Sequence, residues 1–188
     1  MTDPQRLPIH VRAIRAEAWK VSDTELDVSG HLVDDRPQGA PVWFDLAPTS
    51  TIHDMRLTIR VRYPDLVITR AAGSMTTHPY TICPEALPPL EKLVGISVAQ
   101  GFTRAVNERL GRQLGCAHLT ALIQALGPVV RQAVGAAFRD ERQPPRADRD
   151  AWWVDTCHAW RAQGPLHARL VAGDIEGMRA LSARRRPA

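Results

Sequence analysis

The feature that most constrains the fold is the strict alternation of apolar and polar residues over 52–62. Successive side chains of a strand point to opposite faces, so this segment predicts a β-strand with one buried face. That face would carry four apolar residues: Met55, Leu57, Ile59 and Val61. A turn is predicted at 63–65 and a second strand over 66–75, so the two strands would form a hairpin.

The rest of the N-terminal half is also predicted to form strands, and the C-terminal half helices. Weaker alternation predicts strands over 9–18 and 25–33, followed by a loop rich in proline and glycine over 36–48. Apolar residues at helical spacing then predict three helices: 84–92, 100–110 and 118–138. Strands followed by helices indicate an α+β fold, in which an antiparallel sheet from the N-terminal half packs against helices of the C-terminal half.

Two details of the helical half can be predicted. Gly127 and Pro128 lie inside the longest helix, and a proline there removes one backbone hydrogen bond. This helix is therefore expected either to kink or to divide in two. Asp174 is expected to cap a last short helix that ends at Leu181, because its carboxylate can accept a hydrogen bond from the first turn.

Composition narrows the classes of function. With 188 residues, 44% of them hydrophobic, the chain suits one domain, 1–188, with a linker-like charged segment at 139–150 and a basic flexible tail at 183–188. No run of about 18 residues is free of charge and no export signal is present, so we expect no membrane span, a cytoplasmic location and reduced cysteines. The net charge of +4 comes mainly from the tail, and without a nucleic-acid-binding motif we expect no nucleic-acid partner.

His53 is the first candidate for chemistry. It shares the predicted buried face of the strand over 52–62, and a buried imidazole needs a partner for each ring nitrogen. It is either a core histidine bonded to a backbone carbonyl, or a metal ligand or base at the rim of the sheet. Asp54 points to the opposite face and is not expected to be catalytic.

The second candidate is Cys116 with His118, between a glycine-rich loop and the long predicted helix. The positive end of a helix dipole favours a thiolate. A thiolate binds zinc or iron, or acts as a nucleophile. The other interpretation is that Cys116 is a small buried residue and that His118 is a surface group in the first helical turn.

The third candidate is the segment 77–84, where two prolines restrict the backbone around His78 and Cys83. Such a corner either holds a site or only joins a strand to a helix. Four side chains are the candidate ligands of one zinc or iron ion: His53, Cys83, Cys116 and His118. Three histidines are the candidate general acids or bases: His53, His78 and His118. Cys157 and His158 form one more pair, to which no role is assigned.

Five short elements spread over nearly the whole chain carry a resemblance to a known family: His53-Asp54-Met55, Pro79-Tyr80 with Cys83, the glycines Gly95 and Gly101, Gly115-Cys116-Ala117-His118-Leu119, and Cys157-His158-Ala159. Through these elements the chain resembles the bacterial family called domain of unknown function 2889. The family's name implies no activity. The resemblance implies only a setting among catabolic genes for aromatic or acyl compounds.

A second resemblance concerns metal binding. A strand beginning near His53, a hairpin, a loop ligand and a late cysteine before a long helix are similar to the iron–sulfur scaffold proteins of the NifU and IscU type. The resemblance implies that His53 replaces the strand aspartate of the scaffolds. It also implies that His78 or Cys83 takes the position after the hairpin, and Cys116 the late position. Thr51 stands where the scaffolds have another cysteine, and fewer thiolates favour one zinc-like ion over a cluster.

Together these observations predict a cytoplasmic enzyme, a lyase or a hydrolase, that acts on a small catabolic metabolite, with an aromatic compound as one candidate. Its site would use histidine and cysteine, with or without one zinc or iron ion. The alternative is a non-catalytic metal or iron–sulfur carrier, and a third interpretation is an accessory subunit with inert thiols. The expected partners are a small-molecule substrate and, in a homodimer, a second copy of the chain.

Overall fold

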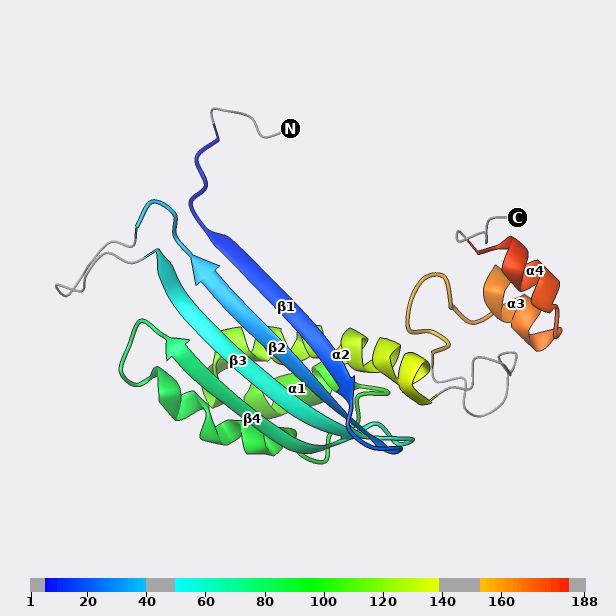
Figure 1. Cartoon of the computed structure of the whole chain (residues 1–188), viewed down its shortest axis with the longest axis horizontal. Helices are drawn as coiled ribbons and strands as arrows, with labels where there is room; N and C mark the ends of the chain where they lie inside the picture. The colour runs from blue at the N-terminus through cyan, green and yellow to red at the C-terminus, as the bar shows by residue number, and fades with distance from the viewer. Residues whose placement is uncertain (1–5, 40–49, 139–152, 183–188) are drawn as a thin grey trace. The chain divides into compact units, whose positions relative to one another are not determined.

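Four strands form one antiparallel sheet in which neighbours along the chain are neighbours in the sheet (Figure 1). The structure is a computed structural model, and it describes residues 6–39, 50–138 and 153–182. The strands are β1 (Val11–Lys20), β2 (Glu25–Asp35), β3 (Thr51–Arg62) and β4 (Val67–Thr77). The helices that follow are η1 (Cys83–Ala86), η2 (Pro88–Leu93), α1 (Phe102–Leu110), η3 (Arg112–Leu114) and α2 (Ala117–Phe138). The predicted α+β fold is confirmed.

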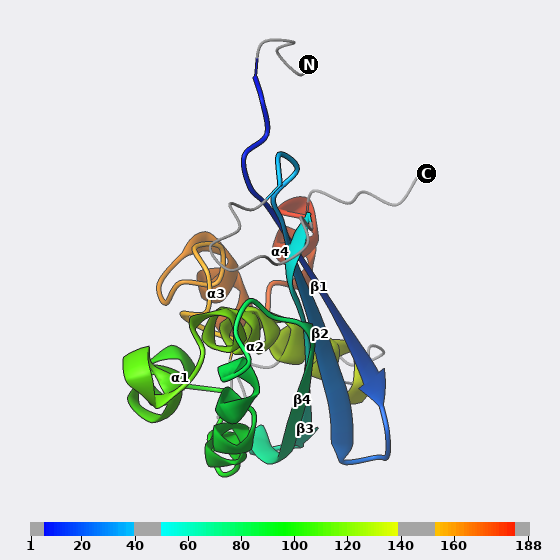
Figure 2. The same ribbon diagram turned by 90° about the vertical axis from the view of Figure 1, so that its left-hand side faces the viewer.

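The long helix α2 covers one face of the sheet. It lies against β1, β2 and β3, and Figure 2 shows the strands nearly edge-on with α1 and α2 on the same side. Its inward residues are apolar and buried: Leu119, Leu122, Ile123, Leu126, Val130 and Val134. The alternation predicted for β3 is confirmed, since its buried residues are His53, Met55, Leu57, Ile59 and Val61. The core therefore lies between this sheet face and α2.

By length and composition alone, α2 is also apolar enough to cross a membrane, with a mean hydropathy of 1.3. The core helix of a globular fold passes the same test, because it too is rich in apolar residues. In this fold α2 packs against the sheet, and about a third of its most apolar window is buried (33%).

Two predicted helices differ in the structure. The segment 84–92 forms two 3-10 helices, η1 and η2, and each of them begins with a proline at one of its first two positions. The helix α2 runs through Pro128 without dividing. At Gly127, a Cβ atom would lie 2.9 Å from the ring of Phe102 on α1. Of the two expectations for this pair, the division of the helix is wrong and the kink stays a prediction, and Gly127 marks the close approach of α1 and α2.

Residues 139–188 form a second compact unit, separate from the unit 1–138. Its described part contains α3 (Pro165–Val171) and α4 (Ile175–Ala180). The predicted cap is confirmed, because Asp174 accepts a hydrogen bond from the backbone N–H of Gly177 at 2.8 Å. Cys157 and His158 are exposed in this unit. The predicted linker and basic tail lie outside the described residues, and the single domain stays a prediction.

Gly30 sets how closely α2 approaches β2. A Cβ atom at this position would lie 2.7 Å from Leu122 Cδ1 and 2.9 Å from Leu126 Cδ2, and both leucines are fully buried. We expect Gly30→Ala to lower the free energy of unfolding by about 1–3 kcal/mol, because the extra methyl group overpacks a closed core. Urea denaturation measures this loss.

The matched control is Gly135→Ala in α2, where nothing lies within 4 Å of an added Cβ. Alanine there should raise the free energy of unfolding by about 0.5–1 kcal/mol, since glycine weakens a helix interior. Equal effects of the two substitutions would show that the contact between Gly30 and α2 is not closely packed.

Candidate functional site

A buried carboxylate occupies one end of the sheet. Asp34 of β2 points to the face that α2 covers, and its side chain is 0% exposed. In the strand register, Asp34 pairs with Arg12 of β1 on one side and with His53 of β3 on the other. Three strands therefore bring a cation, an anion and an imidazole into one row.

Arg12 holds this carboxylate with two hydrogen bonds. Its Nε donates to Oδ1 at 2.6 Å and its Nη2 donates to Oδ2 at 2.7 Å. Burial opposes the ionisation of Asp34, but the hydrogen bonds and charge of Arg12, aided by the nearby histidines, outweigh it and lower the pKa of Asp34. Asp34 is consequently a fixed negative charge at neutral pH.

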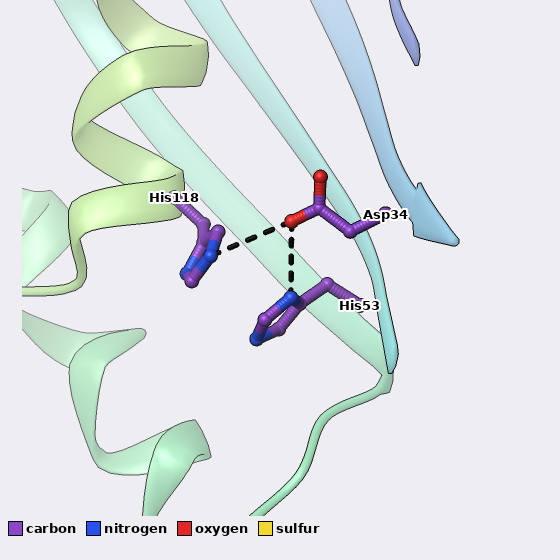
Figure 3. A group of neighbouring side chains, drawn as sticks. All are labelled: Asp34, His53 and His118. Atoms are coloured by element: carbon purple, nitrogen blue, oxygen red, sulfur yellow. Dashed lines mark hydrogen bonds and ion pairs between the residues drawn. The ribbon is translucent and has the colours of Figure 1, made fainter. Parts of the chain in front are cut away.

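Two imidazoles from different elements share one oxygen of Asp34. His53 Nδ1 lies 3.0 Å from Oδ2, and His118 Nε2 lies 3.4 Å from the same atom (Figure 3). The two rings are tilted by 33° with their centroids 3.8 Å apart. His10 Nε2 approaches the other oxygen, Oδ1, at 3.4 Å. His53 is thus bonded to a carboxylate, and not to the backbone carbonyl that a core histidine was expected to use.

Cys116 extends this arrangement through His118. Its Sγ lies 3.6 Å from Nδ1 of His118, the ring nitrogen that does not face Asp34. The carbonyl of Cys116 accepts a 2.8 Å hydrogen bond from the backbone N–H of Thr120, so this cysteine stands at the N-terminus of α2 as predicted. We call the following residues the Asp34 cluster: Arg12, Asp34, His53, Cys116 and His118.

Both cluster histidines have a lowered pKa. Burial is the largest cause for His53 and for His118, and the charge of Asp34 raises each pKa without offsetting it. For His118 the neighbouring His53 lowers the pKa further. Both rings are therefore neutral at pH 7, and a neutral imidazole can accept a proton or ligate a metal.

The lowered pKa values predict that the protein loses stability in mild acid. Below the ordinary histidine pKa of about 6.5, the unfolded chain takes up protons that folded His53 and His118 do not. The free energy of unfolding should therefore fall with pH, by up to about 1.4 kcal/mol per pH unit for each histidine. Asp34 adds a loss at lower pH, because its stabilising ionisation disappears as the pH falls through its lowered pKa.

Urea denaturation between pH 7.5 and 5.5 measures this slope, and NMR titration of the ring protons assigns it to the two histidines. His53→Asn should make the slope shallower. A stability that stays constant over this range, or rings that titrate above pH 6.5, would contradict the prediction.

The structure brings together three of the residues singled out from the sequence: His53, Cys116 and His118. Nδ1 of His78 lies 2.9 Å from the carbonyl oxygen of Tyr80, and Cys83 begins η1. Among the described residues, the ligand atoms that lie within 4.8 Å of one another belong to Asp34, His53 and His118, and neither Cys83 nor Cys116 is among them. The roles predicted for His78 and Cys83 stay predictions.

Asp34 and Arg12 were not found by sequence reasoning. The second strand was predicted to end at Val33, which left Asp34 outside the strand, between it and the loop predicted over 36–48. In the structure β2 continues to Asp35, and one face carries Leu26, Val28, Gly30, Leu32 and Asp34. Extending the alternation of β2 by one residue would have placed this carboxylate on the buried face.

The opposite face of the sheet carries a separate set of polar side chains. Asp54 points there as predicted, and its Oδ1 lies 2.7 Å from Nε2 of His31. A hollow of about 530 Å³ on this side is lined by Arg15, Glu17, Trp19, Ser29, Gly30, His31, Arg56 and Thr58. None of these residues belongs to the Asp34 cluster. The side chains alternate with those of the buried face, whereas Gly30 shares the row of Asp34 and has no side chain.

The comparisons with known proteins identify a family. A family model described as "Protein of unknown function (DUF2889)" matches residues 10–132. The chain belongs to the DUF2889 family. The DUF2889 match runs from just before β1 into α2 and includes every residue of the Asp34 cluster. No curated protein and no solved structure matches the chain, so the resemblance to iron–sulfur scaffolds stays a prediction.

Proposed function

We propose that this DUF2889 protein is an enzyme, a hydrolase or a lyase, that transfers protons on a small-molecule substrate at the Asp34 cluster. The observation that carries the proposal is a single buried carboxylate that contacts two neutral imidazoles. If the cluster only stabilised the sheet, the ion pair between Arg12 and Asp34 would be enough. Such a structural role does not require two histidines on the same carboxylate, one of which also contacts a thiol.

His53 is the proposed general base. Asp34 accepts the hydrogen bond from Nδ1–H and thereby leaves Nε2 as the basic nitrogen. This Nε2 makes no hydrogen bond within the described part of the chain, and the side chain is 10% exposed. Because its pKa is lowered, the ring is unprotonated at neutral pH and ready to accept a proton from water or substrate.

His118 is the second proposed acid–base group. It reaches the same carboxylate from α2, whereas His53 lies on β3, so the substrate would meet two bases held by two rigid elements. After one ring accepts a proton, the charge of Asp34 stabilises the imidazolium. A pair of this kind can take a proton from one atom and return it to another, as hydrolysis and elimination both require.

A metal site is the second candidate, because the ligand atoms of Asp34, His53 and His118 lie within 4.8 Å of one another. Two histidines and a carboxylate suit zinc or iron. Arg12 disfavours this candidate, since its guanidinium already binds both oxygens of Asp34 and repels a cation. Stoichiometric metal that is lost in His53→Asn would favour it, and a brown, sulfide-containing protein would favour the carrier.

The proposal is tested with a panel of esters, thioesters and hydroxyacyl compounds, both aromatic and aliphatic. The aromatic members follow from the family resemblance, and the hydroxyacyl members test for a lyase that eliminates water. Turnover that survives metal chelation and falls in His53→Asn would support proton transfer by the cluster. Turnover unchanged in both His53→Asn and His118→Asn would contradict it.

A further inference from the structure

We infer that Cys116 is a nucleophile of the Asp34 cluster and that the substrate is an acyl ester or thioester. This inference rests on the proposed function and adds a covalent step to it. It follows from the positions of three side chains that come from β2 and from the start of α2: Asp34, Cys116 and His118.

The ring of His118 lies between the thiol of Cys116 and the carboxylate of Asp34. Sγ of Cys116 lies 3.6 Å from Nδ1, and Nε2 of the same ring lies 3.4 Å from Oδ2 of Asp34. Because Asp34 is ionised, it favours the tautomer with the proton on Nε2. Nδ1 is then the basic nitrogen, and it faces the thiol. This is the order of nucleophile, base and orienting carboxylate that nucleophilic catalysis uses.

Positive charge lies near the thiol from two directions. The pKa of Arg12 is raised chiefly by its hydrogen bonds to Asp34 and, to a lesser extent, by Cys116, so the guanidinium is within electrostatic reach of the sulfur. The second source is the N-terminus of α2, a helix of 22 residues that begins directly after Cys116. Both can stabilise the negative charge that the sulfur gains as it loses its proton to His118 during the attack.

The same helix end supplies hydrogen-bond donors. In α2 the first backbone bond runs from the N–H of Thr120 to the carbonyl of Cys116. The N–H groups of 117–119 precede that bond and have no acceptor within the helix. Donors of this kind stabilise the negative oxygen that forms when a carbonyl carbon is attacked. A nucleophile at the helix end therefore has an oxyanion site beside it.

The reaction balances without an added oxidant or reductant. The thiol proton of Cys116 passes to Nδ1 of His118 while sulfur bonds to the carbonyl carbon, and the bond to the leaving alcohol or thiol breaks. His118 then gives its proton to that leaving group. Water, activated by His53, cleaves the acyl-cysteine thioester, releases a carboxylic acid and restores the thiol.

The first test is alkylation of the whole native protein by iodoacetamide, with all three cysteines followed by peptide mass spectrometry. We expect half-buried Cys116 to react about tenfold or more faster than exposed Cys157, since His118 can accept the thiol proton as the sulfur attacks. His118→Asn should remove this difference, and His31→Asn, on the other face of the sheet, should preserve it. Circular dichroism and the rate at half-buried Cys83, which belongs to the same unit as the cluster, report whether each variant is folded.

The second test uses p-nitrophenyl acetate as the acyl donor. We expect an acetyl group on Cys116 that hydroxylamine removes and that is absent in Cys116→Ala. Cys116 that reacts no faster than Cys157, or acetylation only elsewhere, would overturn the inference. If His53→Asn abolishes turnover while Cys116→Ala retains it, the proposed function stands and the nucleophile fails. If neither variant changes turnover, both fail.

Discussion

Asp34→Asn is expected to lower the free energy of unfolding by about 3 kcal/mol. The substitution keeps the shape of the side chain but removes the charge that pairs with Arg12, and it turns one acceptor into a donor that faces donors. Removing one partner of a buried ion pair costs about 3–5 kcal/mol. The low end applies here, because the Arg12 side chain is 36% exposed and water replaces part of the lost interaction.

Urea denaturation at pH 7.5 measures this loss, and the sheet contains a matched control. Asp27 forms the same two-bond pair with Arg60, with both distances 2.8 Å, but on the partly exposed face of the sheet. Each of these two side chains is 30% exposed. Asp27→Asn should therefore cost clearly less. Equal losses in the two variants would mean that the burial of Asp34 adds nothing to its stabilising effect.

His53→Asn is expected to lower kcat by about 10²–10⁴-fold on any substrate the protein turns over, because it removes the proposed general base. Asparagine keeps a polar group near Asp34 but cannot accept and return a proton at neutral pH. In the wild type, kcat/KM should fall as the pH drops through the lowered pKa of His53. The activity should thus persist somewhat below pH 6.5, where an unperturbed imidazole is half protonated.

His31→Asn is the control for this variant. His31 also pairs with an aspartate, Asp54, at 2.7 Å, but it lies on the face of the sheet away from α2. Its substitution should leave kcat and the pH profile unchanged. If His31→Asn and His53→Asn reduced kcat equally, the effect would come from general damage to the sheet, and His53 would not be the base.

Much of the fold was predictable from local patterns. The alternation over 52–62 extends along a whole strand, and the apolar spacing over 118–138 extends along a whole helix, so each element could be recognised with its buried face. His53 and Cys116 were identified for the same reason: the first belongs to the buried row of its strand, and the second stands where a helix begins. Such features depend on the periodicity of neighbouring residues.

The cluster itself depends on contacts between distant segments. Asp34 lies at the end of β2, where a carboxylate normally indicates a loop, and only its pairing with Arg12 and His53 makes its burial favourable. Both Cys83 and Cys116 were candidates, but spacing along the chain does not show that the sulfur of Cys116 contacts an imidazole that in turn reaches Asp34.

The sequence by itself therefore determined the α+β class, the buried face of β3, the position of α2 and two of the histidines worth testing. Only the tertiary structure decided that Asp34 joins them and that Arg12 keeps it ionised. The physical reason is that periodicity records which side of an element is buried. The strand register and helix packing decide which buried side chains meet.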